Sequence, residues 1–334
     1  MAGLKIAAPF VFLAGLTAPC PTQAQLLLVG NKGEDTVSFV DFRTGNECAR
    51  VPTGKAPHEI ALSPDGRRAA VVAYGGTTVD IFDIASARLE KRIDIAPNDG
   101  PHGIAWVSAN RIVLAADRSN SVVILDPRRG SFRSVVTGQK GSHMLVVSPD
   151  RRLAYTANIL SGTISVIDLA RGAKLRDIAI GGNPEGIAIT RDGQQLWVGD
   201  NSGPRVRVVD LAGDRIVATL PTDSVAFRVG ISPDGTRAVT SNLVSGTINL
   251  FDVATRQPLR SIRVSGSPAA MQVTLAFADE GRSVLVAETA HNTVAQVDLE
   301  TGSLLRRFTA GKNGDGLAVS PLNCRSGVRA NAGS

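Results

Sequence analysis

Three of the four histidines in this sequence stand at one position of a recurring pattern. His58, His102 and His143 each lie near the start of a short apolar run. In later runs the same position is Glu185, Phe227 and Asp315. Neutral imidazole nitrogens and carboxylate oxygens are the ligands that zinc, copper and iron sites use. The pattern therefore predicts that one divalent metal ion is bound by His58, His102, His143 and Glu185.

A second group of polar side chains lies in loops that would open on the same side as the histidines. Its members are carboxylates, amides and the fourth histidine, and most of them follow the second apolar run of a repeated unit. We predict a ligand-binding set of Asp117, Asn158, Asp200, Asn242, Glu288, His291 and Asp315. A few polar groups that converge at one opening are typical of a small-molecule site.

The alternative interpretation is that the histidines are structural. His58 has the same strand parity as Ile60 and Leu62, and residues two apart in a strand lie on one face. Strict alternation would therefore direct the ring toward a neighbouring sheet instead of a central channel. A polar binding mouth without a metal is a third interpretation, and the sequence leaves all three open.

Motifs of several other chemistries are absent from the sequence. It contains no GxSxG nucleophile elbow, no GxxxxGK phosphate loop, no HExxH zinc helix and no CxxCH haem attachment sequence. The histidines and carboxylates are therefore the side chains whose positions matter most.

Short strands have to position these side chains. The segment 153–192 contains four apolar runs separated by turn-forming residues, which is typical of a four-stranded antiparallel meander. The turn SPDG, first found at Ser63–Gly66, recurs in full or looser form so that seven turns can be aligned. Its Pro, Asp and Gly supply turn geometry and not catalysis. Because the apolar spacing of amphipathic helices is missing, we predict an all-β chain of seven units.

The recurring letters resemble a known family. YTAN followed by SGTISVIDL, with SPDG turns and repeats of roughly 40 residues, resembles the YVTN-repeat β-propellers of bacteria. The resemblance implies a seven-bladed ring of four-stranded blades, related to WD40 and NHL propellers, which serve as enzymes, scaffolds and ligand binders. Residues 284–298 and the preceding AAMQVTLAF depart from the pattern. Since 315–320 supplies one strand and 26–51 supplies three, the two ends of the chain should share one blade.

These features favour a binding or scaffold propeller that recognises a small ligand, a metal or a partner protein at its loop-rich mouth. One alternative is a metal-dependent propeller enzyme of the lyase or lactonase type that uses the histidines. DNA binding is the second alternative, because the net charge is +6 and positive charge attracts phosphate. Only 4% of the residues are aromatic, so platforms for base stacking are scarce and nucleic acid is the weaker candidate. We expect a monomer and assume no catalysis.

Residues 1–24 have the pattern of a secretory signal peptide. A short basic start precedes the apolar run 6–16, which is too short to span a bilayer, and small residues stand before Gln25. We therefore predict export to the periplasm, a propeller over 25–324 and a disordered tail over 325–334. No later segment is apolar for long enough to form a transmembrane helix.

Cys48 and Cys324 remain after removal of the predicted signal peptide, and an exported pair of cysteines favours a disulfide. Both would lie at the same end of the shared blade, so the bridge would tie the chain ends together. It should stabilise the fold by about 4 kcal/mol in the chain-entropy model. Non-reducing mass spectrometry of tryptic peptides should show the two cysteines joined, and reduction should lower Tm. Free thiols at both positions in exported protein would contradict this prediction.

Overall fold

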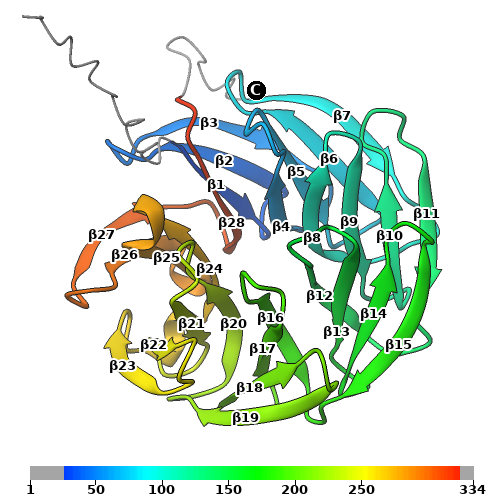
Figure 1. The fold of residues 1–334 in the computed structure, drawn as a ribbon. Coiled ribbons are helices and arrows are strands. Elements are labelled where there is room, and N and C mark those ends of the chain that lie inside the picture. Colours follow the sequence, from blue (N-terminus) through cyan, green and yellow to red (C-terminus); the bar gives the residue numbers. More distant parts are fainter. Residues whose placement is uncertain (1–25, 324–334) are drawn as a thin grey trace, which may run out of the picture.

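The computed structural model describes residues 26–323, which form seven four-stranded antiparallel sheets. Each sheet is one blade, and the blades follow one another around a central axis (Figure 1). Three short 3₁₀ helices are the only helices in this part of the chain, so the all-β, seven-bladed fold expected from the sequence is confirmed. No helix in the described residues is both long and apolar enough to cross a membrane.

The blades are numbered along the chain, beginning with the first blade that is built from four consecutive strands. The strands of each blade are named from the axis outward. Blade 1 contains β4 (Pro57–Leu62), β5 (Arg68–Ala73), β6 (Thr78–Asp83) and β7 (Arg88–Asp94). Blade 2 contains β8 (Pro101–Ser108), β9 (Arg111–Ala116), β10 (Ser121–Leu125) and β11 (Phe132–Val136). Blade 3 contains β12 (Ser142–Val147), β13 (Leu153–Asn158), β14 (Thr163–Asp168) and β15 (Ala173–Ala179). Blade 4 contains β16 (Pro184–Ile189), β17 (Gln195–Asp200), β18 (Arg205–Asp210) and β19 (Arg215–Pro221).

The remaining three blades complete the ring. Blade 5 contains β20 (Ala226–Ile231), β21 (Arg237–Asn242), β22 (Thr247–Asp252) and β23 (Pro258–Arg263). Blade 6 contains β24 (Gln272–Ala278), β25 (Ser283–Glu288), β26 (Thr293–Asp298) and β27 (Leu304–Thr309), with the helices η1 (Pro268–Ala270), η2 (Asp279–Gly281) and η3 (Thr289–His291) around them. Blade 7 contains β28 (Gly314–Ser320), β1 (Leu26–Asn31), β2 (Thr36–Asp41) and β3 (Glu47–Pro52). The sequence irregularities of blade 6 therefore become short helices between strands of the usual kind.

The two ends of the described chain close the ring in blade 7. β28 pairs with β1, with Leu26 opposite Ser320, as the sequence predicted. Apolar side chains from the faces of adjacent blades then pack together. Phe39 of blade 7 and Phe82 of blade 1 are fully buried, and their ring centroids lie 6.2 Å apart in an edge-to-face arrangement. Each blade buries its faces only by stacking on its neighbours, so ring closure protects the first and last blades together.

Three sequence predictions fall wholly or partly on residues outside the described range of 26–323. The signal peptide (1–24) and the tail (325–334) lie outside it. Cys324 also lies outside it, whereas Cys48 is in β3 and packs against the core between blades 7 and 1. The disulfide between the chain ends therefore stays a prediction, as do the export and the periplasmic location.

Every inner strand carries one residue more than the second strand beside it, near the end where the predicted site residues lie. Along β4, the pairing with β5 shifts by one residue between Pro57 and Ile60. The inner strands of the other six blades show the same kind of shift. An extra residue bends a strand and re-aims the neighbouring side chains. Strict alternation, which favoured structural histidines, therefore does not hold where the three histidines lie.

Gly103 shows how closely the inner strands approach one another. It follows His102 in β8, and a Cβ atom at this position would lie 2.5 Å from the backbone nitrogen of Leu145 in β12. It would also lie 2.8 Å from Cα of Met144. Since both neighbours are backbone atoms of the next blade, only glycine allows this approach.

Substitution Gly103→Ala should therefore push β8 away from β12 and lower the free energy of unfolding by about 1–3 kcal/mol, as overpacking does. Urea unfolding followed by circular dichroism would measure the change. Gly76→Ala is the control, because a Cβ atom at Gly76 would meet nothing within 4 Å, and it should change stability by less than about 0.5 kcal/mol. Equal effects of the two substitutions would contradict the account of inner-strand packing.

Candidate functional site

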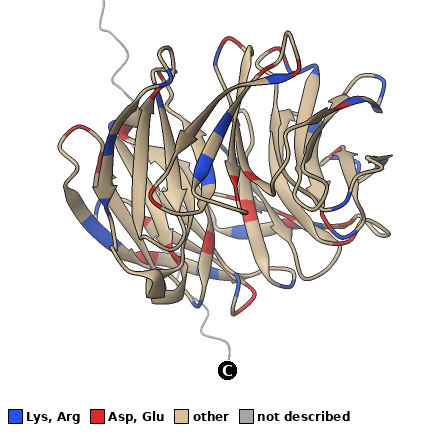
Figure 2. Ribbon diagram, turned by 90° about the horizontal axis from the view of Figure 1, so that it is seen from below, with Lys and Arg blue, Asp and Glu red and all other residues tan. Residues whose placement is uncertain are grey.

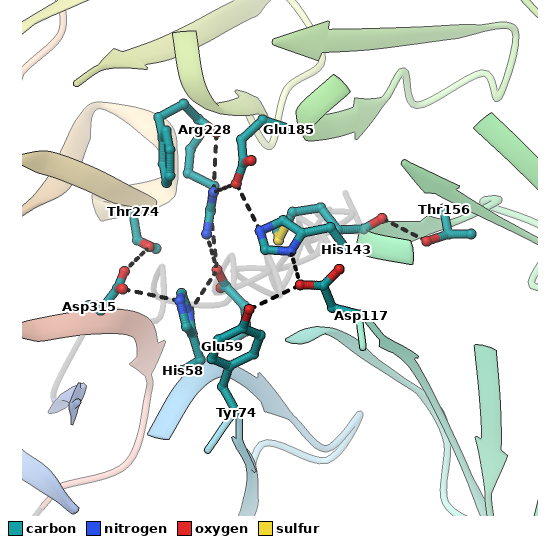
Figure 3. A network of polar contacts seen from close by, with 12 residues as sticks. His58, Glu59, Tyr74, Asp117, His143, Thr156, Glu185, Arg228, Thr274 and Asp315 are labelled. Carbon is teal, nitrogen blue, oxygen red and sulfur yellow. Dashed lines mark hydrogen bonds and ion pairs between the residues drawn. The ribbon is translucent and has the colours of Figure 1, made fainter. Parts of the chain in front are cut away.

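The inner strands bring three histidines from adjacent blades into one stack. His58 lies in β4, His102 in β8 and His143 in β12. The ring centroids of His58 and His102 are 4.0 Å apart, and those of His102 and His143 are 3.6 Å apart. His102, the middle ring, is only 1% exposed. The structure therefore joins the three histidines that the repeat pattern singled out, and Figure 3 shows the polar contacts around His58 and His143.

Asp315 of β28 orients the ring of His58. Oδ2 of Asp315 lies 3.3 Å from Nε2 of His58, and Oδ1 accepts a hydrogen bond of 2.9 Å from Thr274 (Figure 3). Lys32, in the loop after β1, places Nζ 3.5 Å from the same carboxylate and 3.1 Å from Nε2. Nε2 of His58 therefore lies between an acceptor, Asp315, and a donor, Lys32. The tautomer with its hydrogen on Nε2, directed at Asp315, is the one that leaves a lone pair on Nδ1.

Arg228 of β20 links two carboxylates on different sides of the cluster. Its guanidinium donates to Oε1 of Glu185 at 2.8 Å and to Oε1 of Glu59 at 3.0 Å. The side chains of Arg228 and Glu185 are 4% and 1% exposed. Burial alone would lower the pKa of Arg228, but the charges of Glu59 and Glu185 raise it. The three groups therefore form a buried ionic bridge in which the loss of one partner would leave an uncompensated charge.

His143 is held between two carboxylates. Its Nε2 lies 3.0 Å from Oε1 of Glu185, and its Nδ1 lies 3.4 Å from Oδ2 of Asp117, which also accepts a hydrogen bond from Tyr74 at 3.0 Å. Burial alone would lower the pKa of His143, but the charge of Glu185 and the contact with Asp117 raise it to about 9. A protonated imidazole has no lone pair for a metal, so His143 belongs to the surroundings of the other two rings.

His58 and His102 have the opposite character. Burial lowers the pKa of His58 to about 3, although Asp315 opposes this shift. Burial, together with the neighbouring His143, lowers the pKa of His102 well below its ordinary value. Both rings are therefore neutral, which is the form that binds metals. The Nδ1 atoms of all three stacked rings are buried and make no hydrogen bond within the described residues, although that of His143 faces Asp117.

Glu59 completes a set of three ligand atoms. His58, Glu59 and His102 each offer one such atom, and the three atoms lie within 4.8 Å of one another. Around a tetrahedral zinc ion with bonds of about 2.0–2.2 Å, ligand atoms lie roughly 3.3–3.6 Å apart, so the three side chains would have to move closer together to bind one ion. Burial raises the pKa of Glu59, although Arg228 opposes the shift, so a cation here would favour its ionised form.

Four of the loop residues predicted as ligands lie within their own blades and not in the cluster. They are fully buried, each at the end of a second strand, and are Asn158, Asp200, Asn242 and Glu288. The amide of Asn158, for example, donates to Thr163 at 3.0 Å and to Ser165 at 2.9 Å. His291, at the end of η3, is exposed and also lies outside the cluster. Asp117 and Asp315 are the two members of the predicted loop set that the structure places in the cluster.

Asp117 differs from Asn158 because it occupies another repeat position. By strand pairing, the equivalent of Asn158 in blade 2 is Ala116, so Asp117 stands one residue further along. Lys32 and Tyr74 occupy the position of Asp117 in blades 7 and 1. These three side chains, from consecutive blades, contact the histidine stack or its carboxylates. The first residue after the second strand is therefore the repeat position whose side chain reaches the cluster in blades 7, 1 and 2.

Sequence reasoning missed Lys32, Glu59, Tyr74 and Arg228. Phe227 is the repeat equivalent of the histidines in blade 5, whereas Arg228, which by strand pairing is the equivalent of Glu59, enters the cluster. A charged residue within an otherwise apolar inner strand, as in HEIAL and FRVGI, is the signal that could have found Glu59 and Arg228.

The family of the chain follows from a match over most of its length. Residues 29–320 match the family model described as lactonase, 7-bladed beta-propeller. The chain belongs to this family. The match agrees with the propeller expected from the sequence, while the YVTN-repeat name remains a resemblance.

Individual relatives of this lactonase-family chain are distant. It is 22% identical over 304 residues to Antigen Lp49 of Leptospira interrogans, which covers 82% of this chain and 65% of the relative. It is 24% identical over 232 residues to hydrazine synthase subunit beta of Kuenenia stuttgartiensis, which covers 59% of this chain and 54% of the relative. The chain therefore spans less than two thirds of the length of these curated relatives.

Two solved structures share the fold. Hydrazine synthase of Kuenenia stuttgartiensis has a TM-score of 0.66 at 17% identity, with 77% of this chain and 87% of that chain covered. Dihydro-heme d1 dehydrogenase NirN in complex with DHE also has a TM-score of 0.66, at 19% identity, with 92% of this chain and 78% of that chain covered. Identities this low show a common fold and nothing about the ligand of this chain.

Asp200 should make the stability of the fold depend on pH. Burial alone would raise its pKa, but hydrogen bonds from Ser202, the backbone of Asn183 and Arg205 lower it below the ordinary 3.8. A lowered folded-state pKa stabilises the fold above the unfolded value and loses this contribution as pH falls through the folded value. The contribution of Asp200 should therefore be complete at neutral pH and disappear progressively below about pH 4.

Substitution Asp200→Asn should lower Tm at pH 7, because Arg205 and Arg207 lose a buried ion-pair partner. The difference in Tm between the wild-type and variant proteins should shrink as pH falls from about 5 toward 2. Thermal unfolding across this range would measure it. Asp210→Asn is a control at a partly exposed carboxylate at the end of β18 in the same blade, for which no ion pair is found within the described residues. A constant difference for Asp200→Asn at all pH values would contradict the assignment.

Proposed function

We propose that this propeller is a binding protein whose inner strands hold one divalent transition-metal ion on His58, Glu59 and His102. The observation that carries the proposal is the pair of neutral, buried imidazoles whose Nδ1 atoms have no hydrogen-bond partner, beside the partly buried carboxylate of Glu59. A buried polar atom without a partner is costly to the fold. Coordination of a metal would satisfy both nitrogens at once.

The surroundings of His58 support this assignment. Metal-bound histidines usually donate their second ring nitrogen to a carboxylate, which fixes the tautomer and the ring orientation. Asp315 occupies that place, 3.3 Å from Nε2 of His58, and Thr274 holds Asp315 in turn. This arrangement leaves Nδ1 of His58 directed to the side on which Oε1 of Glu59 lies, 3.8 Å away.

The cluster offers several carboxylate oxygens to a cation. Four carboxylates converge there, and they are Glu59, Asp117, Glu185 and Asp315. They face the cations Lys32, Arg228 and protonated His143, and Arg118 stacks on Tyr74 at the edge of the cluster. Arg228 binds Oε1 of Glu59, and the second oxygen of that carboxylate remains for a metal. Copper, zinc and iron accept this mixture of imidazole and carboxylate.

The proposal does not include a reaction. The centroids of the stacked rings are separated by 3.6 to 4.0 Å, and His58 and His102 are buried, which suits an ion better than an organic substrate. Nucleic acid is not proposed either, because basic and acidic residues are mixed over the loops at both ends of the ring (Figure 2). We retain export to the periplasm as a proposal based on the signal-like residues 1–24.

Metal-free protein titrated with Zn²⁺ or Co²⁺ in a calorimeter should bind one ion. Asp315→Asn should weaken binding about 10–100-fold, as loss of an outer carboxylate does, and His102→Ala should weaken it more, because a ligand is lost. His143→Ala should weaken binding less than His102→Ala, since His143 is held by Glu185 and Asp117.

The exposed His291 supplies the matched control, and His291→Ala should leave the affinity within about twofold of the wild-type value, which is the scale of a surface substitution. Circular dichroism would verify that each variant is folded. Wild-type protein that binds no ion above background, or a folded variant lacking all three stacked histidines that still binds one ion, would contradict the proposal.

A further inference from the structure

A groove lies between blades 1 and 2, away from the histidine cluster. Its volume is about 430 Å³, which lies in the range of pockets for small organic molecules. Blade 1 contributes the start of β5 and the outer strand β7, and blade 2 contributes the end of β8 and the turn after β10. The lining residues are Arg68, Ile81, Glu90, Lys91, Trp106, Ala109, Pro127 and Arg128.

The groove combines an apolar floor with a basic rim. Ile81 is 3% exposed and Pro127 is buried, and Trp106 is partly buried against the core between blades 1 and 2. The indole nitrogen of Trp106 already donates to the carbonyl oxygen of Ser108 at 2.9 Å. The indole therefore has no free donor, and its contribution to the groove is apolar surface.

The three cations that line the groove differ in how far neighbouring groups compensate their charges. Arg68 donates to Glu90 at 2.5 Å, so these two charges largely compensate each other. Lys91 donates to the carbonyl oxygen of Arg128 at 2.8 Å, and its ammonium group keeps two further donors. Within residues 26–323, no hydrogen bond or ion pair holds the guanidinium of Arg128. Lys91 and Arg128 are therefore available to a negatively charged group.

Two other blade junctions serve as internal comparisons. The groove between blades 4 and 5, of about 320 Å³, is lined by three aspartates and by no lysine or arginine. The groove between blades 5 and 6, of about 180 Å³, is lined by four carboxylates and two arginines. Neither is lined by a tryptophan. A pocket that includes residues of blades 2 and 3, of about 340 Å³, shares Trp106 but has a single cation, Arg151. Since the blades are repeats of one unit, the three cations beside Trp106 distinguish the groove between blades 1 and 2 from these other pockets.

We propose that this groove binds a small anion that carries a flat apolar body, such as an aryl carboxylate. The apolar body would pack on Trp106, Ile81 and Pro127, where it would be removed from water. The negative group would accept hydrogen bonds from Arg128 and Lys91, which are stronger than hydrogen bonds between neutral groups. This site is independent of the proposed metal site.

The probe for the test is 2-naphthoate, with the uncharged 2-naphthylmethanol as its neutral counterpart. Isothermal titration calorimetry in the presence of EDTA separates this binding from any metal binding. Fluorescence gives a second readout, because the sequence contains two tryptophans and Trp197 is fully buried. The wild-type protein should bind one naphthoate saturably with a change in Trp106 emission, and naphthylmethanol about tenfold more weakly.

Arg128→Glu and Arg129→Glu form a matched pair of variants. Both change the net charge equally, but Arg129 is 84% exposed and does not line the groove. Arg128→Glu should weaken naphthoate binding at least about tenfold, whereas Arg129→Glu should change it less than about twofold. Circular dichroism would confirm that both variants fold.

Three results would overturn the proposal: the absence of saturable binding to wild-type protein, an equal loss in the two variants, or equal affinity for the neutral counterpart. None of these results bears on the metal site, because the titrations contain EDTA.

Discussion

The cluster depends on one geometric constraint, which is the close approach of the inner strands around the axis. Each inner strand gains one residue relative to its partner strand, and the gain re-aims the side chains at that end. Glycine at Gly103 then lets neighbouring backbones come close enough for the rings of His102 and His143 to stack at 3.6 Å. Residues far apart in sequence meet as a result, and Arg228 contacts Glu59 across 169 positions of the chain. Because water is largely excluded there, every charge needs a partner.

The fold could be predicted from the sequence further than the site could. Turn chemistry and apolar runs repeat visibly, so they indicated the number of blades and the closure of the ring by both ends of the chain. A repeated position also singled out His58, His102 and His143. The partners of these histidines depend on register, which a sequence period does not specify. In blade 5 the side chain that enters the cluster is Arg228, which lies one residue beyond the histidine position and is equivalent by register to Glu59. Asp117, which contacts His143, likewise lies one residue beyond the position of Asn158, whose side chain bonds within its own blade.

The buried charges are not needed for a blade to pack. In blade 6 the repeat equivalent of His58 is Val273, which is 6% exposed, and this blade forms the same four-stranded sheet. A buried ionic bridge such as that of Arg228 with Glu59 and Glu185 is weak evidence for stabilisation, because an apolar replacement is often neutral or better. Blade packing alone therefore does not account for the concentration of histidines and carboxylates in blades 7 and 1 to 4, with Arg228 of blade 5.

The central claim is that Nδ1 of His58, Nδ1 of His102 and a carboxylate oxygen of Glu59 share one ion. X-ray absorption spectroscopy of protein loaded with one equivalent of Zn²⁺ tests this directly, because it reports the atoms bound to the metal. The account predicts a shell of nitrogen and oxygen atoms at about 2.0–2.2 Å, with the outer-shell scattering of two imidazoles. An oxygen-only shell without imidazole scattering, or a sulfur shell at about 2.3 Å, would contradict it.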